Sequence, residues 1–196
     1  KNSLIVAVAS VVLSLTFGLM VVYSLGKRLD KFFSIFYLSA MVPEIIIAVG
    51  LLAIFSWLVI PLGLSALIVG HTLLGLGFVV PMIHARYSEL DKSLLEASAD
   101  LGASTVQTFF KVILPFLYPA LVSAALLVFI ISLDDFLIAF FCAGPTSQTL
   151  SLYIFALIRS GVSPVVNALS MFMLGVSTLL VLIYSYVSKK SSGGMF

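Results

Sequence analysis

Three carboxylates occur in or beside long apolar runs, where a charged side chain has few partners. Glu44 follows Pro43 inside one run, and Asp134 and Asp135 follow another. A carboxylate at mid-membrane depth costs about 2.5–3.5 kcal/mol, so each of these groups must face protein, water or a partner. The apolar runs themselves hold no lysine or arginine. A pathway lined by these carboxylates therefore favours cations.

Each carboxylate also has a simpler interpretation. Glu44 could lie near the outer end of a shifted helix and reach solvent, and the aspartate pair could be a solvated helix end. One aspartate can also point inward while the other packs structurally. If these carboxylates line a pathway, we expect Glu44 and the aspartate pair to act at different depths, because weak, distributed sites let a cation leave. Asp134 and Asp135 project about 100° apart on a helix, which disfavours a catalytic pair that shares a proton.

Other residue types point away from an enzyme. His71 and His84 have no acidic or sulfur partners at metal-ligand spacing, so polar packing is the better interpretation. The single Cys142 is expected to be a small packed side chain. The sequence contains neither a serine nucleophile elbow nor a phosphate-binding loop. We therefore expect no catalytic residues, no metal and no cofactor in this chain.

Residues 84–111 gather eight of the 20 Asp, Glu, Lys, Arg and His side chains into one aqueous segment. Ser93-Leu94-Leu95-Glu96 has the Ser-x-x-Glu form of a capping box and predicts a helix start. Gly102 is placed to end that helix in a left-handed conformation. Ser104-Thr105-Val106-Gln107 predicts a second helix that runs toward Leu114, ahead of Pro115. The pattern predicts two short helices that meet at a sharp glycine corner; the capping pattern alone would also fit an ordinary amphipathic helix at the membrane interface.

The same segment carries a family signature. Glu96-Ala97-Ser98, Gly102 after three residues, and Val112-Ile113-Leu114-Pro115 after nine more resemble the EAA motif of ABC importer permeases, Glu-Ala-Ala-x3-Gly-x9-Ile-x-Leu-Pro. Ser98 and Val112 are mild departures. The wider pattern covers nearly the whole chain and resembles the C-type permease of spermidine/putrescine importers. It includes Met41-Val42-Pro43-Glu44, Asp100-Leu101-Gly102-Ala103-Ser104, Ser132-Leu133-Asp134-Asp135, Gly144-Pro145, Gly161-Val162-Ser163-Pro164 and Asn167-Ala168-Leu169.

This resemblance implies an all-α, type I ABC importer permease fold in the bacterial inner membrane. It implies that a coupling helix docks on a cytoplasmic ATPase dimer, which holds ATP-Mg, and that a second permease subunit and a periplasmic or extracellular substrate-binding protein complete the system. The implied cargo is a polyamine. The implied ATPase-coupling residues are Glu96, Ala97, Ser98, Asp100, Gly102, Leu114 and Pro115.

Two alternatives remain open. The chain could belong to an importer of the same family for another small cationic or organic solute. It could instead be an ion-coupled secondary transporter, which the intramembrane carboxylates and proline-broken spans would also suit. Uptake that survives an inactive ATPase but collapses with the ion gradient would favour this second alternative.

The elements that position these residues are apolar helices. Of the 196 residues, 62% are hydrophobic and 9% are charged, and the mean hydropathy is +1.26, which requires a lipid bilayer as the main solvent. The formal net charge of +2 is too small to suggest a nucleic-acid surface. About five spans are expected, at residues 4–25, 32–57, 66–83, 116–131 and 165–187. The second is interrupted at Pro43, and Gly70, Gly75 and Gly77 favour close helix approach in the third.

Basic residues set the orientation. Lys27, Arg28 and Lys31 follow the first span, and Lys189-Lys190 follow the last, so both places are predicted to be cytoplasmic. Five spans then put residue 1 outside, and we expect a further helix before it, which gives six spans. We treat residues 1–190 as one permease domain with a cytoplasmic coupling segment at 84–115, followed by a disordered tail at 191–196.

Overall fold

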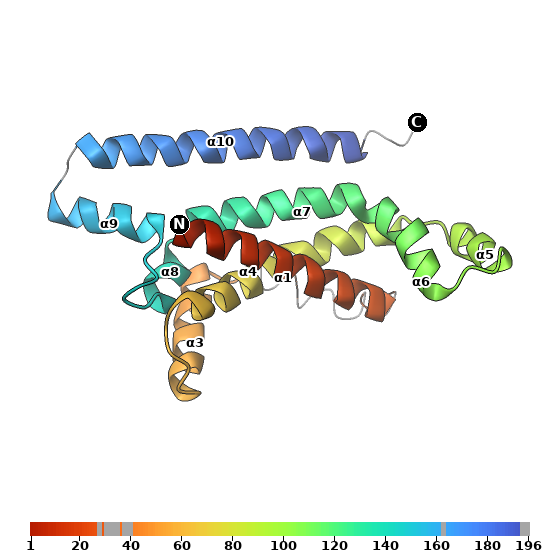
Figure 1. The fold of residues 1–196 in the computed structure, drawn as a ribbon, viewed down its shortest axis with the longest axis horizontal. Helices are drawn as coiled ribbons and strands as arrows, with labels where there is room; N and C mark the ends of the chain where they lie inside the picture. Colours follow the sequence, from red (N-terminus) through yellow and green to blue (C-terminus); the bar gives the residue numbers. More distant parts are fainter. Residues whose placement is uncertain (27–28, 30–35, 37–40, 162–163, 193–196) are drawn as a thin grey trace.

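The computed structural model describes residues 1–26, 29, 36, 41–161 and 164–192 (Figure 1). Within these residues every regular element is helical, as the predicted all-α class requires. The elements are α1 (Asn2–Leu25), α3 (Glu44–Trp57), α4 (Leu64–Ser88), α5 (Lys92–Asp100), α6 (Thr105–Thr108), a π-helical turn (Phe109–Ile113), α7 (Leu114–Asp134), α8 (Leu137–Cys142), α9 (Leu150–Ser160) and α10 (Pro164–Ser192).

Among the described residues, four helices are long and apolar enough to cross a membrane: Asn2–Leu25, Leu64–Ser88, Thr105–Asp134 and Pro164–Tyr186. They confirm the first, third, fourth and last predicted spans. Of the predicted second span, the described part is the shorter apolar helix α3, and most of residues 32–43 lie outside the described residues.

Two helices continue past the ends predicted for them, each beyond a proline. Pro81 lies inside α4, which continues past the expected end at Ile83 to Ser88. Pro115 does not separate a cytoplasmic helix from the fourth span, because the helix runs without a break from Thr105 to Asp134. A membrane helix tolerates proline where neighbouring helices and local π adjustments satisfy the freed backbone groups. The π-helical turn directly before α7 is such an adjustment.

Small residues let α1 approach α4 closely. The Ser10 hydroxyl donates to the Ile68 carbonyl at 3.3 Å, and the Ser14 hydroxyl donates to the Thr72 carbonyl at 3.1 Å. A Cβ atom on Gly75 would lie 2.5 Å from Ser14 Oγ. Such contacts are typical of membrane helices, whose association depends on packing and interhelical hydrogen bonds instead of water exclusion.

The buried side chains form two clusters. One lies between α1, α4 and α7 and includes Val22, Val80, Leu117 and Val128. The other joins α3 and α8 to the start of α4, where a Cβ atom on Gly70 would lie 2.7 Å from Ile138 Cγ2. Cys142 is fully buried in this second cluster, as predicted.

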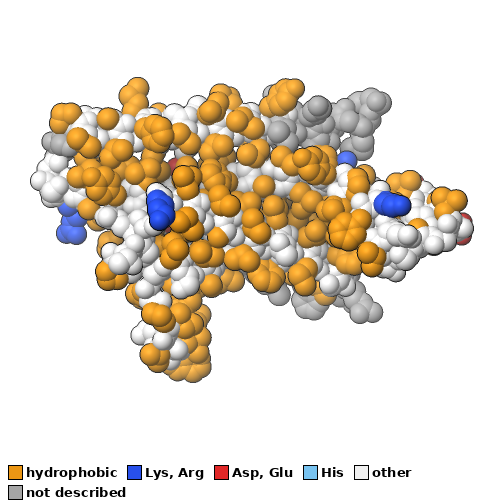
Figure 2. All heavy atoms as spheres, in the orientation of Figure 1, with side chains coloured by type: hydrophobic (Ala, Val, Ile, Leu, Met, Phe, Trp, Pro, Cys, Tyr) orange, Lys and Arg blue, Asp and Glu red, His pale blue; other side chains and the backbone are white. Residues whose placement is uncertain are grey.

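Two helices extend away from the central bundle or lie along its side. α3 projects sideways from the bundle, and α10 runs alongside α7 (Figure 1). The face shown in Figure 2 is largely hydrophobic over the long helices, and few charged side chains interrupt it. This is the surface that a lipid bilayer or an apolar partner would cover.

The helix ends agree with the predicted orientation. The C-terminal ends of α1, α4 and α10 lie at the same end of the molecule as α5 and α6 (Figure 1). Lys27, Arg28 and Lys31 themselves lie outside the described residues. α10 extends through Ser192, and residues 193–196 of the predicted tail lie outside the described residues.

The end of α3 holds an unusual backbone. Val59 has φ 56°, and the amides of Val59 and Ile60 donate to the carbonyls of Ser56 and Phe55 at 3.2 and 2.8 Å. These bonds form a Schellman motif with valine at the position that glycine usually takes. A left-handed conformation costs an L-residue about 1–2 kcal/mol, and the Val59 side chain, 86% exposed, offers little packing in return.

We therefore expect Val59→Gly to stabilise the protein by up to about 1 kcal/mol, since the added freedom of glycine in the unfolded chain offsets part of the gain. Trp57, the only tryptophan, lies two residues away and its fluorescence can report thermal unfolding. Leu58→Gly is the matched control, because Leu58 has φ −82° and should lose stability. A lower melting temperature for Val59→Gly than for the parent would contradict this expectation.

Candidate coupling segment and carboxylate cluster

The first coupling helix begins two residues earlier than predicted. Asp91 Oδ1 accepts the Ser93 backbone N–H at 2.9 Å, and α5 starts at Lys92. Ser93 is therefore not the N-cap, and the predicted Ser93–Glu96 capping box is wrong. Aspartate is among the best N-cap residues. The bonds from the Ser93 amide and hydroxyl hold the pKa of Asp91 below its ordinary value.

The predicted glycine corner is confirmed. Gly102 has φ +76°, its N–H donates to the Ala99 carbonyl at 2.9 Å, and the Ala103 N–H donates to the Ser98 carbonyl at 3.0 Å. The two bonds form a complete Schellman motif. A Cβ atom on Gly102 would meet nothing within 4 Å. The corner therefore needs glycine for its backbone conformation and not for space.

The second predicted helix start is also confirmed. The Gln107 N–H donates to Ser104 Oγ at 3.3 Å, and the Ser104 N–H donates to Gln107 Oε1 at 2.9 Å, which is a full capping box. From Thr105 the chain continues through the π-helical turn into α7. Any rotation of α6 is therefore passed directly to a membrane span.

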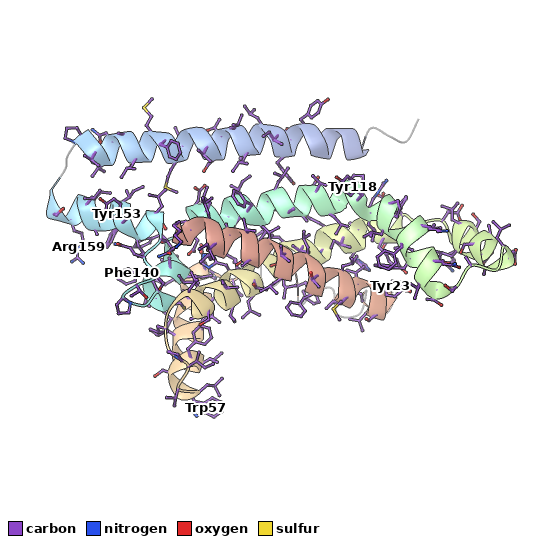
Figure 3. All side chains as sticks on the ribbon, in the orientation of Figure 1. Tyr23, Trp57, Tyr118, Phe140, Tyr153 and Arg159 are labelled. Atoms are coloured by element: carbon purple, nitrogen blue, oxygen red, sulfur yellow. The ribbon has the colours of Figure 1, made fainter. Side chains whose placement is uncertain are left out.

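A pair of hydroxyls joins the two arms of the corner. Ser98 Oγ lies 2.9 Å from Thr108 Oγ1 and also donates to the Leu95 carbonyl. Ser98 is buried, although it stands where the EAA signature has alanine. Tyr23 at the end of α1 contacts the Phe109 ring edge-on at 4.9 Å, and Figure 3 shows Tyr23 on the side of α1 nearest the corner. These long-range contacts fix the angle of the segment against the bundle.

The corner between α5 and α6 exposes apolar side chains on the protein surface. Leu101 is 88% exposed and Val106 is 65% exposed, and Phe110 is similar. The predicted coupling residues Glu96, Ala97, Asp100 and Gly102 are also exposed there, whereas Leu114 and Pro115 lie at the start of α7. Leu101 was not among the predicted coupling residues. Its position directly before the corner glycine was the available signal.

At the other end of α7, Asp135 is buried. Its Oδ1 and Oδ2 accept the backbone N–H groups of Ile138 and Ala139 at 3.3 and 2.9 Å, and so begin α8. The His71 ring lies against the same carboxylate, with Nε2 3.1 Å from Oδ2. The predicted polar packing of His71 is confirmed, and its partner is an aspartate far away in the sequence.

The side chain of Glu44, the first residue of α3, interacts with that of Asp135. The expectation that Glu44 and the aspartate pair act at different depths is therefore wrong for Asp135. Asp134 lies apart from them and is exposed, and the Ser177 hydroxyl on α10 donates to both of its oxygens at 2.8 and 2.9 Å. The two neighbouring aspartates thus differ, because Asp135 is buried and Asp134 is exposed.

Asp134 lines a cavity of about 370 Å³ between α7, α9 and α10. The side chains around it are Phe136, Ser151, Ile154, Ser170, Met173, Leu174 and Ser177. A carboxylate, hydroxyls and an aromatic ring in one apolar cavity can bind an ammonium group and its methylene chain together. The geometry offers no arrangement of acid, base and nucleophile around this cavity.

Comparison with known proteins then decides the family. Residues 10–193 match the family described as binding-protein-dependent transport system inner membrane component. The chain belongs to this family. It is thus a transport permease subunit and a multi-pass membrane protein.

Curated relatives of this permease share its sequence over most of its length. The spermidine/putrescine transport system permease protein PotC of Haemophilus influenzae is 40% identical over 80% of the chain, and the chain covers 61% of that protein. PotC of Escherichia coli is 33% identical over 99% of the chain and 75% of its own length. The putrescine transport system permease protein PotI of Escherichia coli is 38% identical over 69% of the chain and 50% of its length.

A solved structure has the same fold. A chain of the inward-facing MetNI methionine ABC transporter superposes with a TM-score of 0.76 and 22% identity, over 97% of the permease and 93% of that chain. At this identity the likeness concerns the fold alone. It confirms the predicted ABC importer permease fold. Val162 and Ser163 of the wider sequence pattern lie outside the described residues.

Proposed function

We propose that this chain is one permease subunit of an ATP-driven importer that takes up polyamines such as spermidine and putrescine. The similarity to permeases named for these cargoes, over nearly the whole chain in one case, carries the proposal. The cavity at Asp134 supports it independently. A polyamine combines several ammonium groups with apolar spacers, and both kinds of group find a counterpart there.

The importer needs partners that this chain lacks. A cytoplasmic ATPase dimer would bind ATP-Mg and receive the corner between α5 and α6, where exposed Leu101 and Val106 offer apolar anchors. A second permease subunit and the bilayer of the bacterial inner membrane would cover the exposed apolar faces of α3 and α10. A periplasmic or extracellular binding protein would deliver the cargo to the opposite end.

The coupling role falls to two groups of predicted residues. Glu96, Ala97, Asp100 and Gly102 present the docking surface and hold its shape. Ser98 joins the two arms through Thr108, and Leu114 and Pro115 begin the span that carries the motion inward. A short projection whose angle is fixed at both ends can pass ATPase movement into the membrane domain.

The proposal predicts that the Asp134 carboxylate binds the cargo. Asp134→Asn should lower spermidine and putrescine uptake about tenfold or more, because an ionic hydrogen bond contributes about 1.5–3 kcal/mol. Ser177→Ala is the control, since it removes only the hydroxyl that donates to Asp134 and should have a smaller effect. Radiolabelled uptake is measured in cells whose membrane level of the subunit is checked by blot.

Parent-like uptake by Asp134→Asn would exclude Asp134 from the cargo pathway. Energy coupling is tested in the same cells with an inactive ATPase. If uptake persists there and collapses with the ion gradient, the chain works as a secondary transporter and the proposed function is wrong.

A further inference from the structure

The coupling corner is connected to the membrane spans at two points, the end of α4 and the start of α7. The chain leaves α4 at Ser88, passes through α5 and α6, and begins α7 at Leu114. Figure 1 shows the end of α4 and the start of α7 next to each other, at the end of the molecule that carries α5 and α6. A contact between these two points therefore decides how movement of the corner enters the spans.

Arg86, in the last turn of α4, makes such a contact. Its guanidinium lies over the Phe116 ring, 4.2 Å from the ring centroid, and its Nε donates to the Phe116 carbonyl at 3.4 Å. Its Nη1 donates to Glu89 Oε2 at 2.7 Å. One planar cation thus contacts a ring, a backbone carbonyl and a carboxylate at once, which a lysine ammonium cannot reproduce.

The start of α7 is a weak section of helix. Pro115 and Pro119 have no backbone N–H, so neither donates the hydrogen bond that a helix normally makes at its position. The π-helical turn directly before them adds irregular bonding. Fewer internal bonds therefore hold this section than hold a regular helix. Phe116 lies between the two prolines, and Arg86 supports it from a neighbouring helix.

Glu89 orients the guanidinium. It follows Arg86 by three residues, and its side chain is 48% exposed, against 20% for Arg86. An exposed ion pair at this spacing contributes little free energy by itself. Its effect is geometric, because the bond at Nη1 limits the rotation of the guanidinium that contacts Phe116. We call the contact of Arg86 with Phe116 the brace.

We propose that Arg86 is a positioning residue, which holds the start of α7 against the end of α4 so that both spans move together when the coupling corner moves. Without the brace, the proline-containing start of α7 bends and absorbs the movement, and ATP hydrolysis produces less uptake. The effect on coupling rests on the proposed function, whereas the brace itself does not.

Hydrogen exchange on the assembled transporter tests the brace without any cargo. Arg86→Lys keeps the positive charge beside Glu89 but loses the planar contact with Phe116. The backbone amides at the start of α7 should then exchange about fivefold faster than in the parent, because local opening no longer has to break the brace. Glu89→Gln is the matched control: it still offers an oxygen to Nη1, and exchange should change less than about twofold. Unchanged exchange in Arg86→Lys would overturn the brace.

Polyamine uptake per ATP hydrolysed tests the effect on coupling. This ratio should fall about fivefold in Arg86→Lys, while basal hydrolysis and the KM for ATP stay parent-like, because the docking surface is unchanged. Phe116→Leu removes the ring and should cause the same loss, which tests the brace from its other partner. Phe116→Tyr keeps the ring face and should couple like the parent.

A double-mutant cycle separates the brace from two independent structural effects. Arg86→Lys combined with Phe116→Leu should couple no worse than either single variant, because both changes remove the same contact. Losses that multiply in the double variant would overturn the brace as their cause. A loss in Phe116→Tyr equal to that in Phe116→Leu would do the same.

The two proposals fail in different ways. A parent complex without ATP-dependent polyamine uptake would disprove the proposed function, while hydrogen exchange would still decide the brace. Faster exchange in Arg86→Lys together with normal uptake per ATP would overturn the positioning role of Arg86 and leave the proposed function intact.

Discussion

Gly102→Val is expected to uncouple ATP hydrolysis from uptake while the complex still assembles. Gly102 has φ +76°, and this conformation costs an L-residue about 1–2 kcal/mol and a β-branched residue more. A change of that size shifts the population of the native corner by about 5–30-fold. Because α6 continues directly into α7, a corner at the wrong angle would move the span wrongly or not at all.

Gly102→Asn separates backbone conformation from side-chain bulk. Asparagine tolerates the left-handed region, and open space surrounds the position, so this variant should retain most of the coupling. Cargo-stimulated ATP hydrolysis and uptake are measured on purified complexes of equal composition. If Gly102→Val shows normal stimulation and normal uptake, the coupling role of the segment from Asp91 to Leu114 is wrong.

Leu101→Asp is expected to break the contact with the ATPase. Burying an exposed leucine side chain in the ATPase contact contributes about 1.5–3 kcal/mol to binding. An aspartate at the same place would add the cost of burying an unpaired charge. Leu101 is 88% exposed, so its replacement should leave the permease fold unchanged. The affinity of the purified permease complex for its ATPase should fall at least about tenfold.

Leu101→Met is the matched control, because it preserves an apolar side chain of similar volume and should keep parent-like affinity. Affinity is measured by titrating labelled ATPase onto permease complexes in lipid nanodiscs. Unchanged binding by Leu101→Asp would show that the docking surface lies elsewhere.

The features predicted best from sequence are local ones. The Gly102 corner and the Ser104–Gln107 capping box depend on residues a few positions apart, and both formed as expected. The Ser93 box failed through a competing local signal, because Asp91 caps the same helix two residues upstream. The boundary at Pro115 failed because the sequence does not reveal a π-helical turn that lets the helix continue past it.

The cluster of Glu44, His71 and Asp135 could not be read from the sequence. Its members belong to three separate parts of the chain, and only the packing of α3, α4 and α8 brings them together. Composition identified the two carboxylates as unusual, and the histidine as a polar packing residue. Which carboxylate would meet the histidine depended on how the chain turns after α7.

The continuous helix from Thr105 to Asp134 joins the proposed ATPase contact to the proposed cargo contact over 30 residues, about 45 Å. Two binding events on one protein can share a linkage free energy, and linkage is reciprocal. If ATPase docking changes the affinity of Asp134 for a polyamine by some factor, cargo must change the affinity for the ATPase by that same factor. Cargo at the outer end would then act as an allosteric effector of nucleotide hydrolysis, with no contact between cargo and nucleotide.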